Sequence, residues 1–374
     1  MKAILGHPRV LKLMIFLLFL FLAAPALGQE QKSEPAPREA GRGPLRIPSR
    51  PRASLFQSTQ GKQKTEIHFD PATHMVTLKL LVQDENGFFI PNLRRENFAV
   101  YENGVRQQVI SADIEHPPVS LGLLIEFGGQ TPSLNHELGE EVSRAAQQLV
   151  EELDHDDRVA VWKYSDKVEK LVDFSATRDS LTTLLYRLGT PDISETNLYD
   201  AIVSVIGEMR PVTGRKAIVL ISSGVDTSSK ARYQDALNAA ANSDSPIYVL
   251  GLTKVLQNYQ DVYGHRPVAR TDWEKAQREL QELARVSGGR AYIPENTVNL
   301  SSVYDDMLEN IKVRYVIRYR SSDNANLNSP RAIRVELVDP STGGPLRIVD
   351  SNGKTVRARV VIQDSYIPAA ASSR

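Results

Sequence analysis

The strongest constraint on the fold of this chain is a run of apolar residues from Leu121 to Ile125, within the segment LGLLIEFGGQ that ends at Gln130. Large apolar side chains occupy both odd and even positions, so the run lacks the alternation of a strand with one exposed face. The pattern predicts a parallel strand that is covered on both faces. Open α/β sheets bind ligands beyond the carboxyl ends of such strands, so we look for function just after Ile125.

Short apolar segments alternate with helical segments between Val119 and about Ile311, which is typical of a doubly wound, mostly parallel sheet in an α/β domain. Six strands are expected, at 119–127, 158–165, 168–174, 216–222, 246–252 and 290–293. The segments between them carry apolar residues at spacings of three and four, so each helix turns one stripe towards the sheet. The clearest stripe is Leu198, Ile202, Val205 and Met209.

The segments on either side of 119–311 have the period of two that is typical of half-exposed strands. In 64–115, Val76, Leu78, Leu80 and Val82 share one face, and Asn103-Gly104 favours a tight hairpin. Alternation returns in 312–365, before a short tail at 366–374. Each half has too few strands to bury both faces of a sheet. We therefore expect the halves to pair in one β-sandwich-like module, with the α/β domain as an insertion.

The amino terminus has the pattern of a signal peptide over residues 1–28. Lys2, Arg9 and Lys12 precede an apolar run, and Ala26-Leu27-Gly28 supplies small residues for cleavage. About a dozen apolar residues are too few to span a bilayer, which requires roughly 20. The sequence therefore predicts export to a secreted or periplasmic location, with no stable membrane anchor after cleavage.

Residues 29–63 are rich in proline, arginine and serine and contain few large apolar residues, which predicts a disordered linker. Its arginines between Arg38 and Arg52 leave open a contact with anionic lipid or polymer. The chain contains no cysteine, which excludes disulfides and a lipid-anchored lipoprotein. Its formal net charge is zero, which argues against a nucleic-acid partner.

Four segments in fixed order carry a family resemblance: VSLGLLIEF at 119–127, DRV at 157–159, ETNLYDA at 195–201 and IVLISSGVDTSS at 218–229. Their order and spacing resemble the von Willebrand factor type A family, in particular a group of exported bacterial proteins with a related domain. Phe98–Gly104 and Tyr315–Tyr319 resemble the flanks of that group. The resemblance implies an α/β binding domain with a role in adhesion or assembly.

Members of that family hold a divalent cation on three loops, through a DxSxS motif, a threonine and an aspartate in a TDG-like turn. The resemblance places Glu126, Gly128 and Gln130 at the first motif, Thr196 at the threonine and Ser223 at the last aspartate. Only Thr196 matches. Because Mg²⁺ requires near-octahedral oxygen ligands, the sequence predicts a degenerate site and no obligatory cofactor.

Glu126, Thr196 and Asp226 are the remaining candidate ligands for Mg²⁺ or Ca²⁺, and each has another interpretation. Thr196 has the residue type and position of an N-cap for the helix that begins at Asn197. Asp226 suits a cap of the following helix or turn. Glu126 needs some partner or cation, because an unpaired buried carboxylate is costly.

Other segments were searched for metal-binding, catalytic and partner-binding residues. Asp154–Asp157 concentrates carboxylates that could hold calcium or form a helix-to-strand turn. The chain has neither a cysteine nucleophile nor a GxSxG elbow, so we predict no enzyme activity. The segment 252–272 is expected to be a long loop, and its Tyr259, Tyr263, His265 and Arg266 are candidate partner-binding residues. A solvated loop without a partner is the alternative.

The sequence as a whole predicts an exported, non-enzymatic binding module that contacts a protein or an extracellular polymer through loops at the carboxyl edge of its sheet. Two other functions stay open. One is a metal-dependent adhesin that binds Mg²⁺ or Ca²⁺ through substitute ligands. The other is a hydrolase that uses a pair of carboxylates as acid and base.

Overall fold

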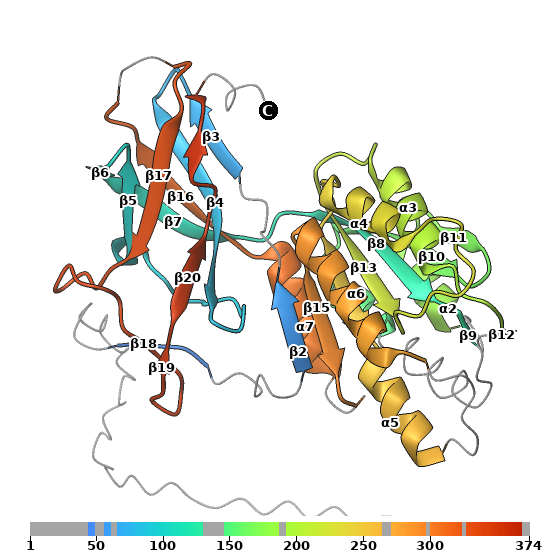
Figure 1. Cartoon of the computed structure of the whole chain (residues 1–374). Helices are drawn as coiled ribbons and strands as arrows, with labels where there is room; N and C mark the ends of the chain where they lie inside the picture. Colours follow the sequence, from blue (N-terminus) through green and yellow to red (C-terminus); the bar gives the residue numbers. More distant parts are fainter. Residues whose placement is uncertain are drawn as a thin grey trace, which may run out of the picture. The chain divides into compact units, whose positions relative to one another are not determined.

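A computed structural model of the chain describes residues 44–48, 56–60, 66–129, 146–186, 192–263, 271–296, 300–323 and 327–368 (Figure 1). The predicted signal peptide and most of the predicted tail lie outside these ranges. Among the described residues, no helix is long and apolar enough to cross a membrane.

The α/β domain contains a seven-stranded sheet. In sheet order its strands are β11 (Val168–Val172), β10 (Arg158–Tyr164), β8 (Val119–Glu126), β13 (Arg215–Ser222), β14 (Ile247–Gly251), β15 (Arg290–Pro294) and β2 (Phe56–Gln60). The five inner strands are parallel, and the two edge strands run antiparallel to their neighbours. Every residue of β8 except Glu126 is buried, so the prediction of a strand covered on both faces is confirmed.

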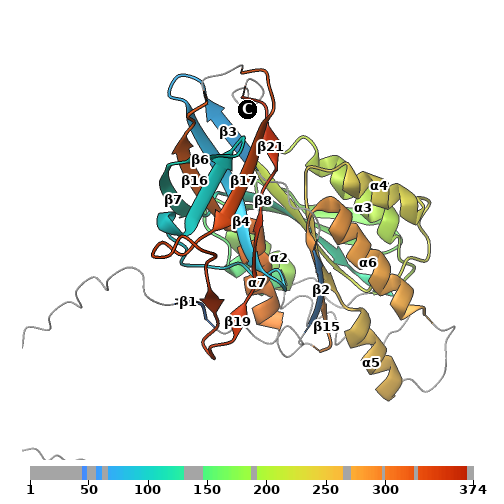
Figure 2. The same ribbon diagram turned by 60° about the vertical axis from the view of Figure 1, so that its left-hand side comes forward.

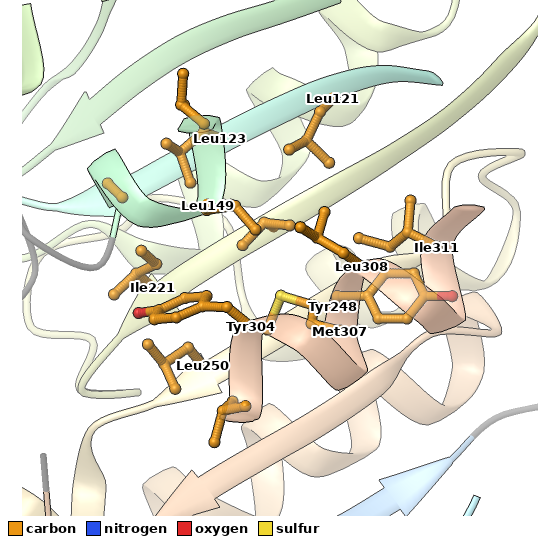
Figure 3. Close-up of a cluster of buried hydrophobic side chains, with 14 of the residues drawn as sticks. Leu121, Leu123, Leu149, Ile221, Tyr248, Leu250, Tyr304, Met307, Leu308 and Ile311 are labelled. Carbon is orange, nitrogen blue, oxygen red and sulfur yellow. The ribbon is translucent and has the colours of Figure 1, made fainter. Parts of the chain in front are cut away.

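Two layers of helices bury the two faces of this sheet. One face packs against α2 (Arg178–Tyr186), α5 (Thr253–Tyr263), α7 (Leu300–Lys312) and the helical residues 146–151. Figure 3 shows Tyr304, Met307 and Leu308 of α7 gathered with Leu121 and Leu250 of the sheet. The other face packs against α3 (Leu198–Met209), α4 (Tyr233–Ala241) and α6 (Trp273–Ser287). The stripe predicted on α3 is buried as expected.

The segment predicted as a linker contains ordered strands, so that prediction is wrong for part of 29–63. Strand β1 (Leu45–Arg46) pairs with β18 (Ile348–Val349), and β2 pairs antiparallel with β15 along all five of its residues. Backbone hydrogen bonds to an existing sheet edge order β2. Composition shows only how many apolar side chains a segment can bury. It does not show that the backbone of the segment can pair with a sheet edge.

Strands from before and after the α/β domain pair with one another, as the sequence predicted. One sheet has the order β20-β4-β16-β7, with β3 also paired to β4, and the other has the order β21-β17-β5-β6. Both sheets contribute side chains to one apolar core. Figure 2 shows their strands close together. The bounds are β3 (Glu66–Asp70), β4 (Met75–Asp84), β5 (Phe98–Glu102), β6 (Val105–Gln107), β7 (Val109–Glu115), β16 (Arg314–Arg320), β17 (Arg331–Leu337), β20 (Ala358–Val361) and β21 (Ser365–Tyr366).

The predicted hairpin between β5 and β6 is present. Asn103 and Gly104 have φ angles of 49° and 80°, the left-handed conformation that a two-residue hairpin turn requires. A short 3-10 helix, η2 (Arg95–Asn97), precedes β5, and β19 (Thr355–Val356) pairs with β18.

Candidate functional site

The candidate site lies where the strand order of the central sheet reverses direction. Numbered along the chain, the six core strands have the order 3-2-1-4-5-6, and the reversal falls between β8 and β13. Ligands of open α/β sheets bind beyond the carboxyl ends of the strands at this point. Glu126 ends β8, Ser222 ends β13 and Tyr164 ends the neighbouring strand β10. The fold therefore brings these three side chains to the edge where a ligand is expected.

The Glu126 carboxylate is held by hydrogen bonds from four protein groups. Its Oε2 accepts from the hydroxyls of Tyr164 and Ser222 at 2.9 Å each, and from the backbone N–H of Ser223 at 2.8 Å. Its Oε1 accepts from the Ser223 hydroxyl at 2.7 Å. Tyr164 and Ser222 also lie 2.8 Å apart. These donors are the partner that a buried carboxylate at Glu126 was expected to need. We call Glu126, Tyr164, Ser222 and Ser223 the Glu126 cluster.

Burial raises the pKa values of Glu126 and Tyr164 in the Glu126 cluster. Part of Glu126 remains at the surface, but its carboxylate is enclosed by protein atoms, and this desolvation raises the pKa of Glu126 above its ordinary value. The hydrogen bonds from Ser223, Ser222 and Tyr164 act in the opposite direction without cancelling it. Burial, followed by the adjacent carboxylate, likewise raises the pKa of Tyr164. The phenol therefore stays protonated and acts as a donor to Glu126.

We expect the raised pKa of Glu126 to make stability depend on pH. Between the ordinary value of 4.5 and the higher value in the folded protein, the native state binds more protons than the unfolded state. The free energy of unfolding should therefore fall as pH rises through this window. Glu126→Gln has no proton to lose, so its melting temperature should change less over the same window. Thermal unfolding of both proteins across that window measures this, and identical pH profiles would contradict it.

Thr196 connects the second loop of the site to the loop that follows β13. Its side-chain hydroxyl donates to Val225 O at 2.8 Å, and its backbone N–H donates to the Thr227 hydroxyl at 2.8 Å. The alternative that Thr196 is the N-cap of α3 is wrong, because Asn197 occupies that position without a side-chain capping bond. Thr196 instead fixes the loop that carries Asp226.

Asp226 lies at the amino terminus of α3, not at the start of the helix that follows it in sequence. Its Oδ1 accepts from the backbone N–H of Tyr199 at 3.3 Å and from the hydroxyl of Ser229. The Ser229 hydroxyl also accepts from the backbone N–H groups of Tyr199 and Asp200. These N–H groups belong to the first turn of α3, where a helix favours negative charge. Asp226 therefore caps α3 from a distant loop.

Gly128 occupies a position with no room for a side chain. A Cβ atom at Gly128 would lie 2.4 Å from Ser194 Oγ and 2.7 Å from Ser165 Cβ. Ser194 follows β12 (Asp192–Ile193), which pairs with β9 (Gly128–Gly129), and Ser165 follows β10. A serine at 128 would require both the Ser194 side chain and the chain at Ser165 to move. Gln130, the other substituted position of the motif, lies outside the described residues.

The three candidate metal ligands have different partners in this structure. Glu126 accepts from hydroxyl and N–H donors, Thr196 donates to a backbone carbonyl, and Asp226 caps a helix. Among the described residues, no group of three or more histidine, aspartate or glutamate side chains could hold a metal ion. The donor set does not fit the several convergent hard oxygen ligands that Mg²⁺ or Ca²⁺ requires.

The acidic turn at Asp154–Asp157 is neutralised from within the protein. Lys312 Nζ, at the end of α7, contacts the carboxylates of Asp154 and Asp157. Asp157 also accepts from the backbone N–H of Val119 at 2.8 Å. A buried lysine thus takes the place that a calcium ion would need, so the turn holds the start of β8 instead.

The expected long loop at 252–272 is wrong for its first half. Residues Thr253–Tyr263 form α5, and they place Tyr259 and Tyr263 one helical turn apart. The helix could have been recognised from Leu252, Val255, Leu256 and Tyr259, which have spacings of three and four. His265 and Arg266 lie outside the described residues.

Tyr164 and Ser222 were missed as site residues by sequence reasoning. Each is a hydroxyl residue that ends a mostly apolar parallel strand, and that placement was visible in the sequence. A polar residue at the carboxyl end of a buried strand is a candidate on topological grounds alone.

Comparisons with known proteins bear on this fold. The family model described as "von Willebrand factor type A domain" matches residues 133–306, and no curated protein matches the sequence. Among solved structures, an aerotolerance-related membrane protein from Bacteroides fragilis NCTC 9343 is 17% identical, with 52% of this chain and 98% of that chain covered and a TM-score of 0.39. BatB from Bacteroides thetaiotaomicron is 18% identical, with 50% and 96% covered and a TM-score of 0.37.

The vWF domain of the type V pili tip protein Mfa5 from Porphyromonas gingivalis is 14% identical, with 52% of this chain and 95% of that chain covered and a TM-score of 0.39. These TM-scores are below 0.5, so the identification depends on the family model and on the strand order of the sheet. The doubly wound sheet, the site at its point of reversal and the match over residues 133–306 identify the α/β domain of this chain as a von Willebrand factor type A domain.

Proposed function

We propose that this chain is an exported, non-enzymatic binding module that contacts a protein or an extracellular polymer without an obligatory metal ion. The contact surface would be formed by the loops at the carboxyl edge of the type A sheet. The observation that carries the proposal is the Glu126 cluster, in which a carboxylate with four protein donors lies at the point of strand reversal.

A metal-dependent site needs oxygen atoms with lone pairs free for a cation, whereas the Glu126 oxygens already accept protein hydrogen bonds. Recognition would then depend on the shape and charge of the surrounding loops. Their exposed side chains carry both signs of charge and several hydroxyls: Asp166, Lys167, Glu195, Thr227, Ser228 and Lys230.

Other parts of the proposal come from the sequence. Export is proposed from the signal-peptide pattern of residues 1–28. Tyr259, Tyr263, His265 and Arg266 remain proposed partner-binding residues, and Tyr259 and Tyr263 belong to the helix that follows β14. Enzyme activity is not proposed, because the chain offers no cysteine nucleophile or GxSxG elbow.

The proposal that no metal ion is required is tested by adding divalent cations. We expect Mg²⁺, Mn²⁺ and Ca²⁺ at millimolar concentration to leave the melting temperature of the full chain unchanged, because ligand binding to the native state alone would raise it. A calorimetric titration with each ion is the second measurement. Micromolar binding that Glu126→Ala abolishes would instead support the metal-dependent adhesin.

The contact surface is tested by quantitative affinity capture from envelope extracts of the source cells, with and without a chelator. Lys167→Glu/Lys230→Glu reverses two exposed charges in the edge loops, and we expect it to deplete the captured partner at least about fivefold. Lys354→Glu, in an exposed turn of the β-module, is the matched control and should capture as much as the wild type. Capture that the chelator abolishes, or that both variants retain equally, would refute the proposal.

A further inference from the structure

A hollow of about 480 Å³ opens between α4 and α6, on the helical face of the type A domain. Its lining residues are Tyr233, Lys275, Arg278, Glu279, Gln281 and Glu282. Figures 1 and 2 show the two helices side by side. The volume lies within the range of small-ligand and side-chain pockets in proteins.

The negative charge of Glu279 lies deeper in this hollow than the positive charges of Lys275 and Arg278. The Glu279 side chain is only 14% exposed, whereas the side chains of Lys275 and Arg278 are 61% and 65% exposed. The inner charge is therefore negative, and the two cations lie at the rim. Since charge interactions strengthen where water is excluded, the inner carboxylate dominates the recognition of a ligand that enters.

Glu279 is hydrogen-bonded on one side and only ion-paired, with Lys275, on the other. Its Oε2 accepts from the Tyr199 hydroxyl at 2.7 Å, while its Oε1 lies 3.8 Å from Lys275 Nζ, beyond hydrogen-bond distance. Tyr199 holds the carboxylate in place and leaves one oxygen able to accept from a ligand. The backbone N–H of Tyr199 contacts Asp226 and Ser229, so this residue also links the hollow to the edge loops.

An aromatic ring lies beside this carboxylate. Tyr233 lines the hollow, and its ring centroid is 5.8 Å from that of Tyr199. Burial, followed by the charges of Glu279 and Glu282, raises the pKa of Tyr233 to about 12, so the phenol is neutral at physiological pH. A neutral tyrosine face beside a carboxylate is a favourable environment for an ammonium or guanidinium group.

We propose that the hollow between α4 and α6 binds an arginine or lysine side chain of a protein partner, with acidic residues on either side of it. The inserted cation packs against Tyr233 and donates to Glu279 Oε1. The flanking carboxylates of the partner pair with Lys275 and Arg278 at the rim, where they compete with the ion pairs that these cations form with Glu279 and Glu274 along α6. The residues that line the hollow all belong to α4 and α6, so this proposal is tested separately from the proposed contact through the edge loops.

The test uses the full chain and three short peptides with blocked ends: Asp-Arg-Asp, Asp-citrulline-Asp and Asn-Arg-Asn. Citrulline has nearly the shape of arginine but no charge. By isothermal titration or ligand-detected NMR, we expect Asp-Arg-Asp to bind at least about tenfold more tightly than the citrulline peptide and about threefold more tightly than the asparagine peptide. Equal binding of the arginine and citrulline peptides would overturn the proposal.

Variants locate the binding in the hollow. Glu279→Gln keeps an acceptor for Tyr199 but removes the charge, and it should weaken Asp-Arg-Asp binding about tenfold. Tyr233→Leu should weaken it about threefold, from loss of the cation–π contact, while Tyr233→Phe retains binding. Glu169→Gln, on β11, is the matched surface control. Wild-type affinity in a folded Glu279→Gln protein, verified by circular dichroism, would also overturn the proposal.

Discussion

Replacing Arg331 by methionine is expected to lower the free energy of unfolding of the β-module by about 3–5 kcal/mol, because it leaves the Glu102 carboxylate buried without its cation. The two side chains are 1% and 0% exposed, and Arg331 Nη1 lies 3.0 Å from Glu102 Oε1. Glu102 also accepts from the hydroxyls of Ser321 and Tyr366, at 2.6 and 2.7 Å. Removing the guanidinium therefore breaks a buried polar network that connects four parts of the module.

This pair also joins the two halves of the chain. Glu102 ends β5, before the type A domain, and Arg331 begins β17, after it. Both tryptophans, Trp162 and Trp273, lie in the type A domain, so tryptophan fluorescence in urea reports on that domain. Hydrogen exchange at the amides of β5 and β17 reports on the β-module. We expect the exchange rates there to rise strongly while the fluorescence midpoint changes less.

A double variant separates the charge from the packing. Glu102→Gln/Arg331→Met removes both charges of this pair. The introduced glutamine keeps an acceptor oxygen for one of the two hydroxyls, and its NH2 group can donate to the other, so the double variant should recover at least half of the lost stability. Replacement of a buried ion pair by neutral groups is often nearly neutral in energy, whereas removal of one partner is not. A loss below about 1 kcal/mol in the single variant, or no recovery in the double variant, would contradict this account.

The strands and helices of the type A domain could be predicted because their signals are local. The apolar run of β8 and the stripe Leu198, Ile202, Val205 and Met209 each reflect burial within one element. The pairing of strands across the inserted domain was also accessible, because neither half can bury both of its faces alone. The amount of apolar surface that each half must cover therefore predicts the pairing, even though no contact between the halves is known from the sequence.

The pairing of β2 and the donors to Glu126 could not be predicted from the sequence, because both depend on partners far away in the chain. Strand β2 is ordered by hydrogen bonds to β15, which lies near the end of the type A domain, and its composition cannot indicate this pairing. The donors to Glu126 come from Tyr164 and Ser223, which are 38 and 97 positions away. The departures from the family's metal motif at Glu126, Gly128 and Ser223 were readable from the sequence. What fills the site depends on which strands are neighbours, and only the sheet order supplies that information.

Replacing Glu126 by alanine is expected to destabilise the type A domain. Alanine removes the acceptor of three hydroxyls and one backbone N–H, and unsatisfied buried donors cost about 1–3 kcal/mol each before water or relaxation compensates. Since Tyr164 and Ser222 can still bond to each other, we expect a net loss of about 2–3 kcal/mol in the unfolding free energy of the type A domain.

Glu126→Gln provides the comparison that identifies the cause of this loss. Glutamine retains an acceptor oxygen and carries no charge, so it avoids the desolvation that raises the pKa of Glu126, and its stability at neutral pH should lie within about 1 kcal/mol of the wild type. Urea unfolding followed by tryptophan fluorescence compares the three proteins, with and without millimolar Mg²⁺. If the cluster of hydroxyl donors stabilises the edge, the order of stability will be the same in both conditions. A wild-type protein that Mg²⁺ stabilises and an alanine variant that it does not would show that Glu126 serves a cation instead.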